Sequence, residues 1–292
     1  METATAASLT NTPNKWAMDW LSWLKIATVA GLTGAIYAFI VPDLVWEWWT
    51  QEESSYGMLI PPIALYIAYL GKTKTLAAPA MESLRGLWLV ALGCLVFMLG
   101  SLASEFFLAR ISFVILLAGL VWTFWGFARL RTLAFPFVLL ATMVPLPGIV
   151  YNVIAVPLQL FASTIATNLA QALGVSIYQD GNIIHLANIS LGVAEACSGL
   201  HSLSAMVVAS LLLGFLNDCS IPSRILLLVI SVPLAIAVNV LRVTGTAILA
   251  DYQTGFAMGF YHSFSGWLVF LLGFGLLALI GKLVSTWTRR TA

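Results

Sequence analysis

Long apolar runs separated by short polar connections fill most of the chain. Runs able to cross a bilayer, about 20 residues each, are expected at 24–42, 57–71, 86–103, 106–127, 133–148, 200–217, 223–245 and 264–284. The second and fifth runs are short and contain Pro61, Pro62, Pro145 and Pro147, so we expect broken or tilted helix ends there. The pattern predicts an all-α polytopic membrane protein with about eight transmembrane helices.

Composition strengthens this interpretation and removes others. The 292 residues are 61% hydrophobic and only 9% charged, with a mean hydropathy of +0.98, which excludes a soluble domain of this length. A net charge of +1 gives no reason to expect a nucleic-acid partner. We expect one transmembrane domain over residues 1–292, with membrane lipid as its surroundings.

Basic residues predict the orientation of the chain. Short loops rich in Lys and Arg stay cytoplasmic. If both termini are cytoplasmic, ten basic residues fall on the cytoplasmic side: Lys15, Lys72, Lys74, Arg85, Arg129, Arg131, Arg224, Lys282, Arg289 and Arg290. Only Arg110 and Arg242 then lie toward the outer half of the membrane.

Residues 149–196 are expected to form a small extracytoplasmic cap. Residues 152–173 could be counted as a ninth span, but crossing there would move Arg224 and the basic C-terminus outside, contrary to the charge rule. Polar residues recur there every three or four positions, which favours an amphipathic helix on the outer face. Asp180-Gly181 between short β-branched runs then predicts a β-hairpin.

The segment "AEACSGLHSL" gathers reactive side chains in an otherwise apolar chain: Glu195, Cys197, Ser198, His201 and Ser202. Cys197 falls just outside the sixth run, at the N-terminal end of its helix. Backbone amides at such an end favour the thiolate form.

Two distant residues are expected at the same membrane depth as Cys197. Arg242 comes 18 residues after Arg224, about 27 Å along a helix, with Asn239 one turn below it. His262 lies at the outer mouth of the last run. A thiol can attack a carbonyl, an imidazole can move protons and a guanidinium can stabilise an oxyanion, so the three together indicate a nucleophilic site.

Alternatives remain open at this point. Ser198 could replace the thiol as nucleophile, with stronger base assistance. His201 is a rival imidazole because it lies four residues after Cys197 on the same helical face. Arg242 could simply extend to the membrane interface.

These residues resemble the exosortase/archaeosortase family of membrane transpeptidases. The similarity rests on "EACSGL", "NVLR" and "FYHSFSGWLVF", supported by "SYGMLIPPI" at 55–63 and "PLP" at 145–147. It implies Cys197 as nucleophile, Arg242 as oxyanion-stabilising or substrate-orienting group and His262, rather than His201, as proton shuttle.

The resemblance also implies partners and location. The substrates would be exported, membrane-anchored proteins with a C-terminal sorting tail that has a short signature such as Pro-Glu-Pro, a transmembrane helix and a basic cluster. The enzyme would cleave near the signature, hold a thioester and transfer the protein to an unidentified acceptor. Bacterial members lie in the inner membrane with the site facing the periplasm.

Further expectations concern Arg110 and the rival functions. Arg110 could bind an acidic residue of the signature, or could simply pair with Glu105 or Glu195. The rival functions are an intramembrane serine protease using Ser198 and His262, and a transporter or scaffold with Glu195, Asn239 and Arg242 along a polar path. No cofactor is expected, and no metal, because the three histidines lack a tight ligand spacing.

Overall fold

A computed structural model of the chain describes residues 20–187, 189–192, 200–253 and 259–291. The chain divides into two compact units, one through Asp43 and one from Leu44 onward. Helix α1 (Trp20–Ile36) belongs to the first, and α2 (Ile40–Thr50) spans the division. The second unit contains a 3₁₀ helix, η1 (Glu52–Leu59), and the helices α3 (Ile60–Leu70), α4 (Lys72–Ala77), α5 (Gly86–Leu102), α6 (Phe106–Trp125), α7 (Phe127–Thr132), α8 (Ala134–Ala141), α9 (Gly148–Ala172), α11 (Leu200–Leu216), α12 (Ile221–Tyr252) and α13 (Gly259–Thr291).

Long apolar helices support a polytopic membrane protein. Among the described residues four helices are long and apolar enough to cross a membrane, or up to five if the bent pair α1 and α2 counts as one span. The four are 106–125, 148–172, 221–252 and 264–287, and three shorter apolar helices cover 54–70, 86–102 and 202–216. The expected count of eight spans and the cytoplasmic termini stay predictions.

Both proline-containing runs depart from a continuous α-helix. The run at 133–148 is helical only through Ala141, in a helix of eight residues, about 12 Å long, and resumes as helix at Gly148. The run at 57–71 begins as 3₁₀ helix and becomes α-helical at Ile60. Proline lacks the N–H donor of a helix and disfavours helix in the residue before it, which explains the interruption at 145–147.

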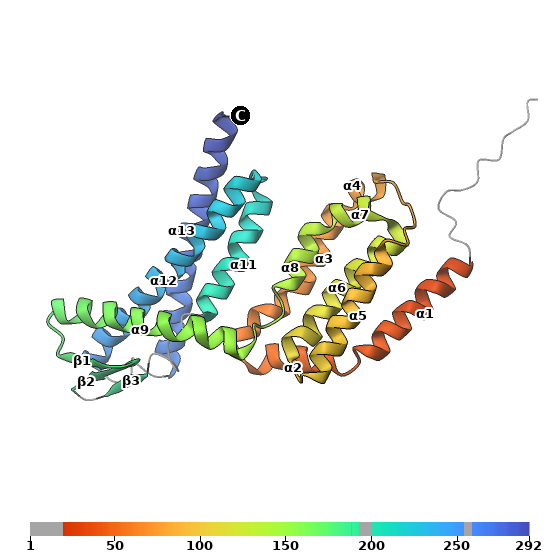
Figure 1. The fold of residues 1–292 in the computed structure, drawn as a ribbon. Helices are drawn as coiled ribbons and strands as arrows, with labels where there is room; N and C mark the ends of the chain where they lie inside the picture. The colour runs from red at the N-terminus through yellow and green to blue at the C-terminus, as the bar shows by residue number, and fades with distance from the viewer. Residues whose placement is uncertain (1–19, 188, 193–199, 254–258, 292) are drawn as a thin grey trace, which may run out of the picture. The chain divides into compact units, whose positions relative to one another are not determined.

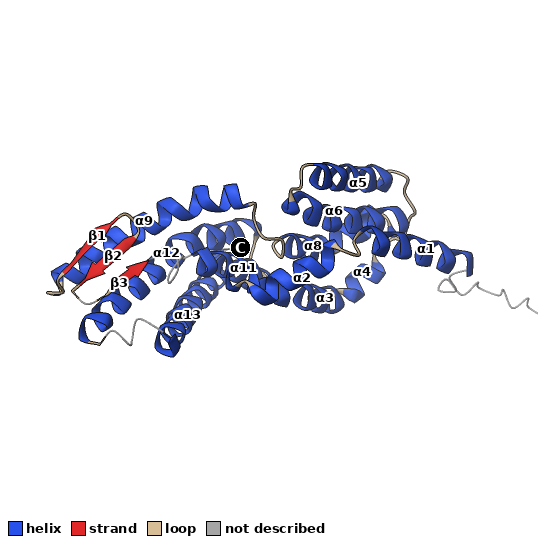
Figure 2. Cartoon of the chain, turned by 90° about the horizontal axis from the view of Figure 1, so that it is seen from below, coloured by secondary structure: helices blue, strands red, loops and turns tan. Residues whose placement is uncertain are grey.

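Helices α5 and α6 form a tightly packed antiparallel pair (Figures 1 and 2). Glycine recurs at every seventh position of α5, as Gly86, Gly93 and Gly100, and all three are buried. A β-carbon added at Gly100 would lie 2.5 Å from the backbone nitrogen of Ala109 in α6. Small residues of this kind let helix backbones approach closely inside a membrane.

Gly100→Ala is expected to lower the unfolding temperature of the detergent-solubilised protein, because the new methyl group would force the two backbones apart. Overpacking of this kind costs about 1–3 kcal/mol. Gly275→Ala in α13 is the matched control, since a β-carbon there meets nothing within 4 Å. An equal unfolding temperature for the two variants would contradict the close α5–α6 contact.

The predicted cap contains a helix and a sheet, as expected, with one strand more. The three antiparallel strands β1 (Ile177–Asp180), β2 (Ile183–Leu186) and β3 (Ser190–Gly192) lie in that order (Figure 2). The hairpin is confirmed, but its turn is Gly181-Asn182, one residue later than predicted, because Asp180 pairs with Ile183. Gly181 has a φ of +60°, which suits the first position of such a turn.

Helix α9 turns part of its polar stripe inward. Gln159, Ser163 and Thr167 are buried, whereas apolar residues such as Val153 and Phe161 are exposed. The helix packs on α12 and qualifies by length and composition as a possible span. Its placement on the outer face stays a prediction.

The last three helices form a bundle around one apolar core. Met206 and Ala209 of α11, Leu227 and Ala235 of α12 and Leu277 of α13 are buried together. Figure 1 shows α11 and α13 extending in the same direction from the end where α9 and the sheet lie. Helix α12 has 32 residues and ends at Tyr252, so it extends beyond the run predicted at 223–245.

Candidate functional site

Arg242 of α12 lies directly against the helix that carries His262. A β-carbon at Gly266 of α13 would lie 2.7 Å from Nη2 and 2.8 Å from Cζ of Arg242. Gly266 is one helical turn after His262. The structure therefore brings the predicted arginine onto the first turns of α13, and glycine leaves the space that the guanidinium occupies.

Packing along the bundle relates the start of α11 to the same level. A β-carbon at Gly273 of α13 would lie close to the side chains of both Val238 of α12 and Met206 of α11. Gly266 is seven residues before Gly273, and Leu200 is six residues before Met206, which is about 9–11 Å back along each helix. Because α11 and α13 run in the same direction, the first residue of α11 lies near the level of Arg242.

The other predicted site residues are described unevenly. Glu195, Cys197 and Ser198 lie outside the described residues. His201 and His262 lie in the first turns of α11 and α13, and their side chains are likewise outside the description. Arg242 is half-buried and lies ten residues before the end of α12, rather than near the end of that helix as predicted.

The cap packs beside this level of α12. Val243 is buried together with Ile177 and Ile184 of the sheet and Ala166 of α9. Asn239, one turn before Arg242, is buried in the same helix. The helix segment with the predicted arginine thus has the cap on one side and α13 on the other.

A cavity of about 760 Å³ lies between η1, α6, the segment before α9 and α11. Its walls include Tyr56 from the "SYGM" motif, Pro145 and Pro147 from the "PLP" motif, and Leu203 and Ser204 from the first turns of α11. Both supporting motifs therefore line one cavity beside the helix that follows Cys197. This volume is in the range of ordinary ligand sites.

Arg110 is buried at the cavity and pairs with Glu47. Its Nη1 lies 2.6 Å from Oε2 of Glu47, and the two side chains are 7% and 20% exposed. An ion pair was one expectation for Arg110, and the pair is present with a different partner. The predicted partner Glu105 was wrong, because Glu105 lines the same cavity without an ion pair to Arg110. The other predicted partner, Glu195, lies outside the described residues. Sequence reasoning missed Glu47, although a carboxylate inside an apolar helix is a recognisable signal.

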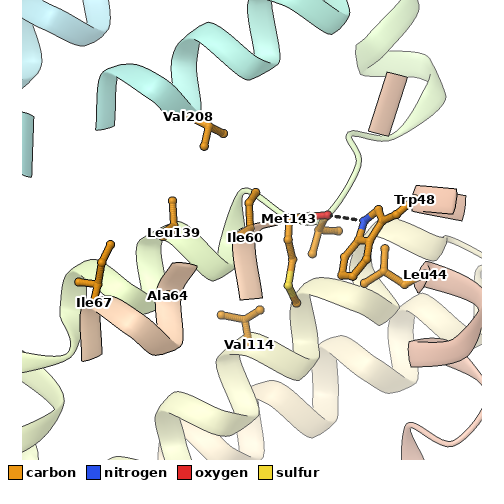
Figure 3. Close-up of a cluster of buried hydrophobic side chains, with 10 residues drawn as sticks. Leu44, Trp48, Ile60, Ala64, Ile67, Val114, Leu139, Met143 and Val208 are labelled. Atoms are coloured by element: carbon orange, nitrogen blue, oxygen red, sulfur yellow. Dashed lines mark hydrogen bonds between the residues drawn. The ribbon is translucent and has the colours of Figure 1, made fainter. Parts of the chain in front are cut away.

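Trp48 connects the two motifs that line the cavity. Its Nε1 donates a 3.0 Å hydrogen bond to the backbone oxygen of Met143, shown dashed in Figure 3. A β-carbon at Gly57 would overlap the Trp48 ring. Glycine at this position therefore lets the 3₁₀ helix pack against Trp48, which in turn holds the chain entering Pro145.

Tyr56 ties the 3₁₀ helix to α11. Its hydroxyl shares a hydrogen bond with Ser204. Burial raises the pKa of the Tyr56 phenol, and the hydrogen bond to Ser204 offsets that rise only in part. Tyr56, which precedes the apolar run 57–71, is therefore a neutral hydrogen-bonding group at physiological pH.

The described residues offer no cluster of three or more His, Cys, Asp or Glu side chains suited to a metal ion.

The fold and these polar sites define a polytopic membrane protein with charged groups buried among its helices. The chain matches the transmembrane exosortase family over residues 48–279 and belongs to that family. Membership suggests a membrane transpeptidase-type role in processing exported proteins. Comparisons with curated proteins and with solved structures give no match.

Proposed function

We propose that this protein is a cysteine transpeptidase that cleaves the C-terminal sorting tail of exported proteins at the outer face of the bacterial inner membrane. The observation that supports it most is the contact of the Arg242 guanidinium with Gly266, one turn from His262. The contact lies near two of the three proposed catalytic positions, Arg242 and His262, which are 20 residues apart in the sequence.

In this mechanism the Cys197 thiolate attacks the carbonyl carbon of the scissile peptide bond. Arg242 stabilises the negative charge that develops on the carbonyl oxygen. The carbon–nitrogen bond then breaks, His262 gives a proton to the departing amine, and a thioester remains on Cys197. An acceptor nucleophile attacks the thioester, loses a proton to His262 and releases the thiolate.

The membrane contributes by confining the substrate. A protein anchored by its own tail helix diffuses in the same plane as the enzyme, with its basic end cytoplasmic and its scissile bond at the outer interface. With eight spans and cytoplasmic termini, the first turns of α11 and α13 lie at that interface. Ser198, His201, Glu195 and Asn239 are supporting residues in this proposal.

Processing of a co-expressed protein with a sorting tail tests the proposal. Cells that contain the enzyme are expected to shorten the tail-bearing protein, seen as a mass shift on a gel, while cells without it leave the protein intact. The reaction in membranes should also yield an intact-mass adduct on the enzyme that hydroxylamine removes. Tails carrying several different signatures that all stay uncleaved, together with no adduct, would argue against a peptidase and favour a transporter or scaffold.

A further inference from the structure

The cavity beside α11 has walls suited to an extended peptide. Aromatic side chains of Tyr56, Phe106, Phe107 and Tyr151 line it together with Pro145 and Pro147. Aromatic walls of this kind bind extended, proline-containing segments, which lose little conformational freedom on binding.

Several apolar side chains of the cavity wall are exposed. Phe106 is 65% exposed, Val138 51% and Leu146 47%. In a protein surrounded by lipid, a wall of this kind admits a ligand from the membrane side. A segment that adjoins a membrane anchor can therefore reach it.

Arg110 brings hydrogen-bond donors to this apolar space. A guanidinium has five N–H donors, and Arg110 directs Nη1 at Glu47 while its guanidinium carbon lies 5.4 Å from the centre of the Phe106 ring. Within the part of the chain that the structure describes, Glu47 is the one hydrogen-bonding or ion-pair partner of Arg110. Among the described residues no Arg110 nitrogen is a fully buried atom without a partner, so the donors that Glu47 does not use are open to acceptors of a ligand in the cavity.

A guanidinium fixed by one carboxylate is well prepared to bind another. Its nitrogens form a planar fork that matches the two oxygens of a carboxylate. Glu47 holds the guanidinium in place and neutralises its charge, so burial of Arg110 is tolerated. The donors that Glu47 does not use can then bind a second carboxylate.

We propose that this cavity binds an extended peptide segment with an acidic side chain, whose carboxylate accepts hydrogen bonds from Arg110, and that Glu47 positions the Arg110 guanidinium. The inference rests on the proposed function, because it takes the ligand to be part of the membrane-anchored substrate. It assigns the "SYGM" and "PLP" motifs to substrate recognition rather than to the chemical step.

Peptide binding tests the cavity without requiring cleavage. The full chain with Cys197→Ala, held in lipid nanodiscs, is titrated with a fluorescent peptide containing Pro-Glu-Pro and with the matched Pro-Gln-Pro peptide. The glutamate peptide is expected to bind about tenfold more tightly, because a charge-assisted hydrogen bond is roughly twice as strong as a neutral one. Equal affinity for the two peptides would overturn the proposal.

Variants of the ion pair identify the residue responsible. Arg110→Gln is expected to abolish the preference for glutamate, whereas Glu47→Gln should keep the preference, because the amide oxygen of glutamine can still accept a hydrogen bond from the guanidinium and hold it in place. Arg129→Gln is the matched control, since Arg129 is a half-buried arginine that bonds to the Ala78 backbone oxygen away from the cavity. A preference that survives Arg110→Gln would overturn the assignment.

A double variant separates loss of recognition from loss of folding. Arg110→Gln leaves Glu47 without its partner, so Glu47→Gln with Arg110→Gln removes both charges at once. This variant is expected to keep the unfolding temperature near that of the parent and to bind both peptides equally. Peptide binding that depends on Arg110, without tail cleavage by the wild type, would contradict the proposed function and support the peptide site in the cavity. Tail cleavage that is unchanged in Arg110→Gln, with no Arg110-dependent peptide binding, would support the proposed function and contradict the peptide site.

Discussion

Cys197→Ala is expected to abolish cleavage of a tail-bearing protein, and Ser198→Ala is expected to retain it. Without the thiolate no acyl-enzyme can form, and loss of a catalytic nucleophile typically costs about 10⁴-fold or more in rate. A hydroxyl at position 198 needs much stronger base assistance than a thiol, so it does not replace Cys197. The measurement is the mass shift of the co-expressed substrate, quantified over time.

Matched controls make the result specific to one thiol. Cys94→Ala removes a half-buried cysteine from α5 and should leave both cleavage and the hydroxylamine-sensitive adduct unchanged. Full cleavage by Cys197→Ala together with loss of cleavage in Ser198→Ala would reverse the assignment and favour the serine protease. Inactivity of Ser198→Ala alone, with normal expression, would make the serine essential beside the thiol.

Local patterns in the sequence predicted most of the helices, because apolar length and proline content act locally. The interruption at 145–147 follows from two prolines within three residues. The hairpin followed from Asp180-Gly181, although the turn itself begins at Gly181. The end of α12 at Tyr252 could not be predicted from the apolar pattern. Residues after 245 include the polar Thr246, Asp251 and Tyr252, which end the apolar run, but the helix continues through them.

Pairings across the chain were beyond sequence reasoning. Arg110 and Glu47 lie 63 residues apart, on different helices, and the nearer carboxylate of Glu105 is the more obvious partner in the sequence. Likewise, nothing in "SYGM" or "PLP" indicates that Trp48 holds both. Such contacts depend on helix packing, which a single sequence does not encode in any short pattern.

A shared membrane depth for Arg242 and His262 was predicted by counting along the helices and stays a prediction, whereas the contact of Arg242 with Gly266 was not predicted. Depth is a sum of helical rises and could be counted along each run. Which side of α12 meets α13 depends on the small residues at their interface. Gly266 and Gly273 on α13 mark that interface, lying against Arg242 and Val238.

Gly266→Ala is expected to lower the rate of cleavage by about 10- to 100-fold. The added methyl group would lie 2.7 Å from Nη2 of Arg242, so the guanidinium must move. A displacement of about 1 Å in a catalytic group can cost about 100-fold. Because Arg242 is proposed to act on the charge that develops in the reaction, the loss should fall on kcat more than on KM. Gly275→Ala on the same helix, with nothing within 4 Å of its β-carbon, should keep the wild-type rate.

A double-variant cycle distinguishes displacement of Arg242 from general damage to α13. In the wild-type background Gly266→Ala is expected to slow cleavage, whereas in an Arg242→Ala background the same substitution should change the residual rate little, because there is no guanidinium left to displace. The unfolding temperature of Gly266→Ala should stay near that of Gly275→Ala. Equal rate losses in both backgrounds would show that Gly266 acts through helix packing, and Arg242 would then need another source of orientation.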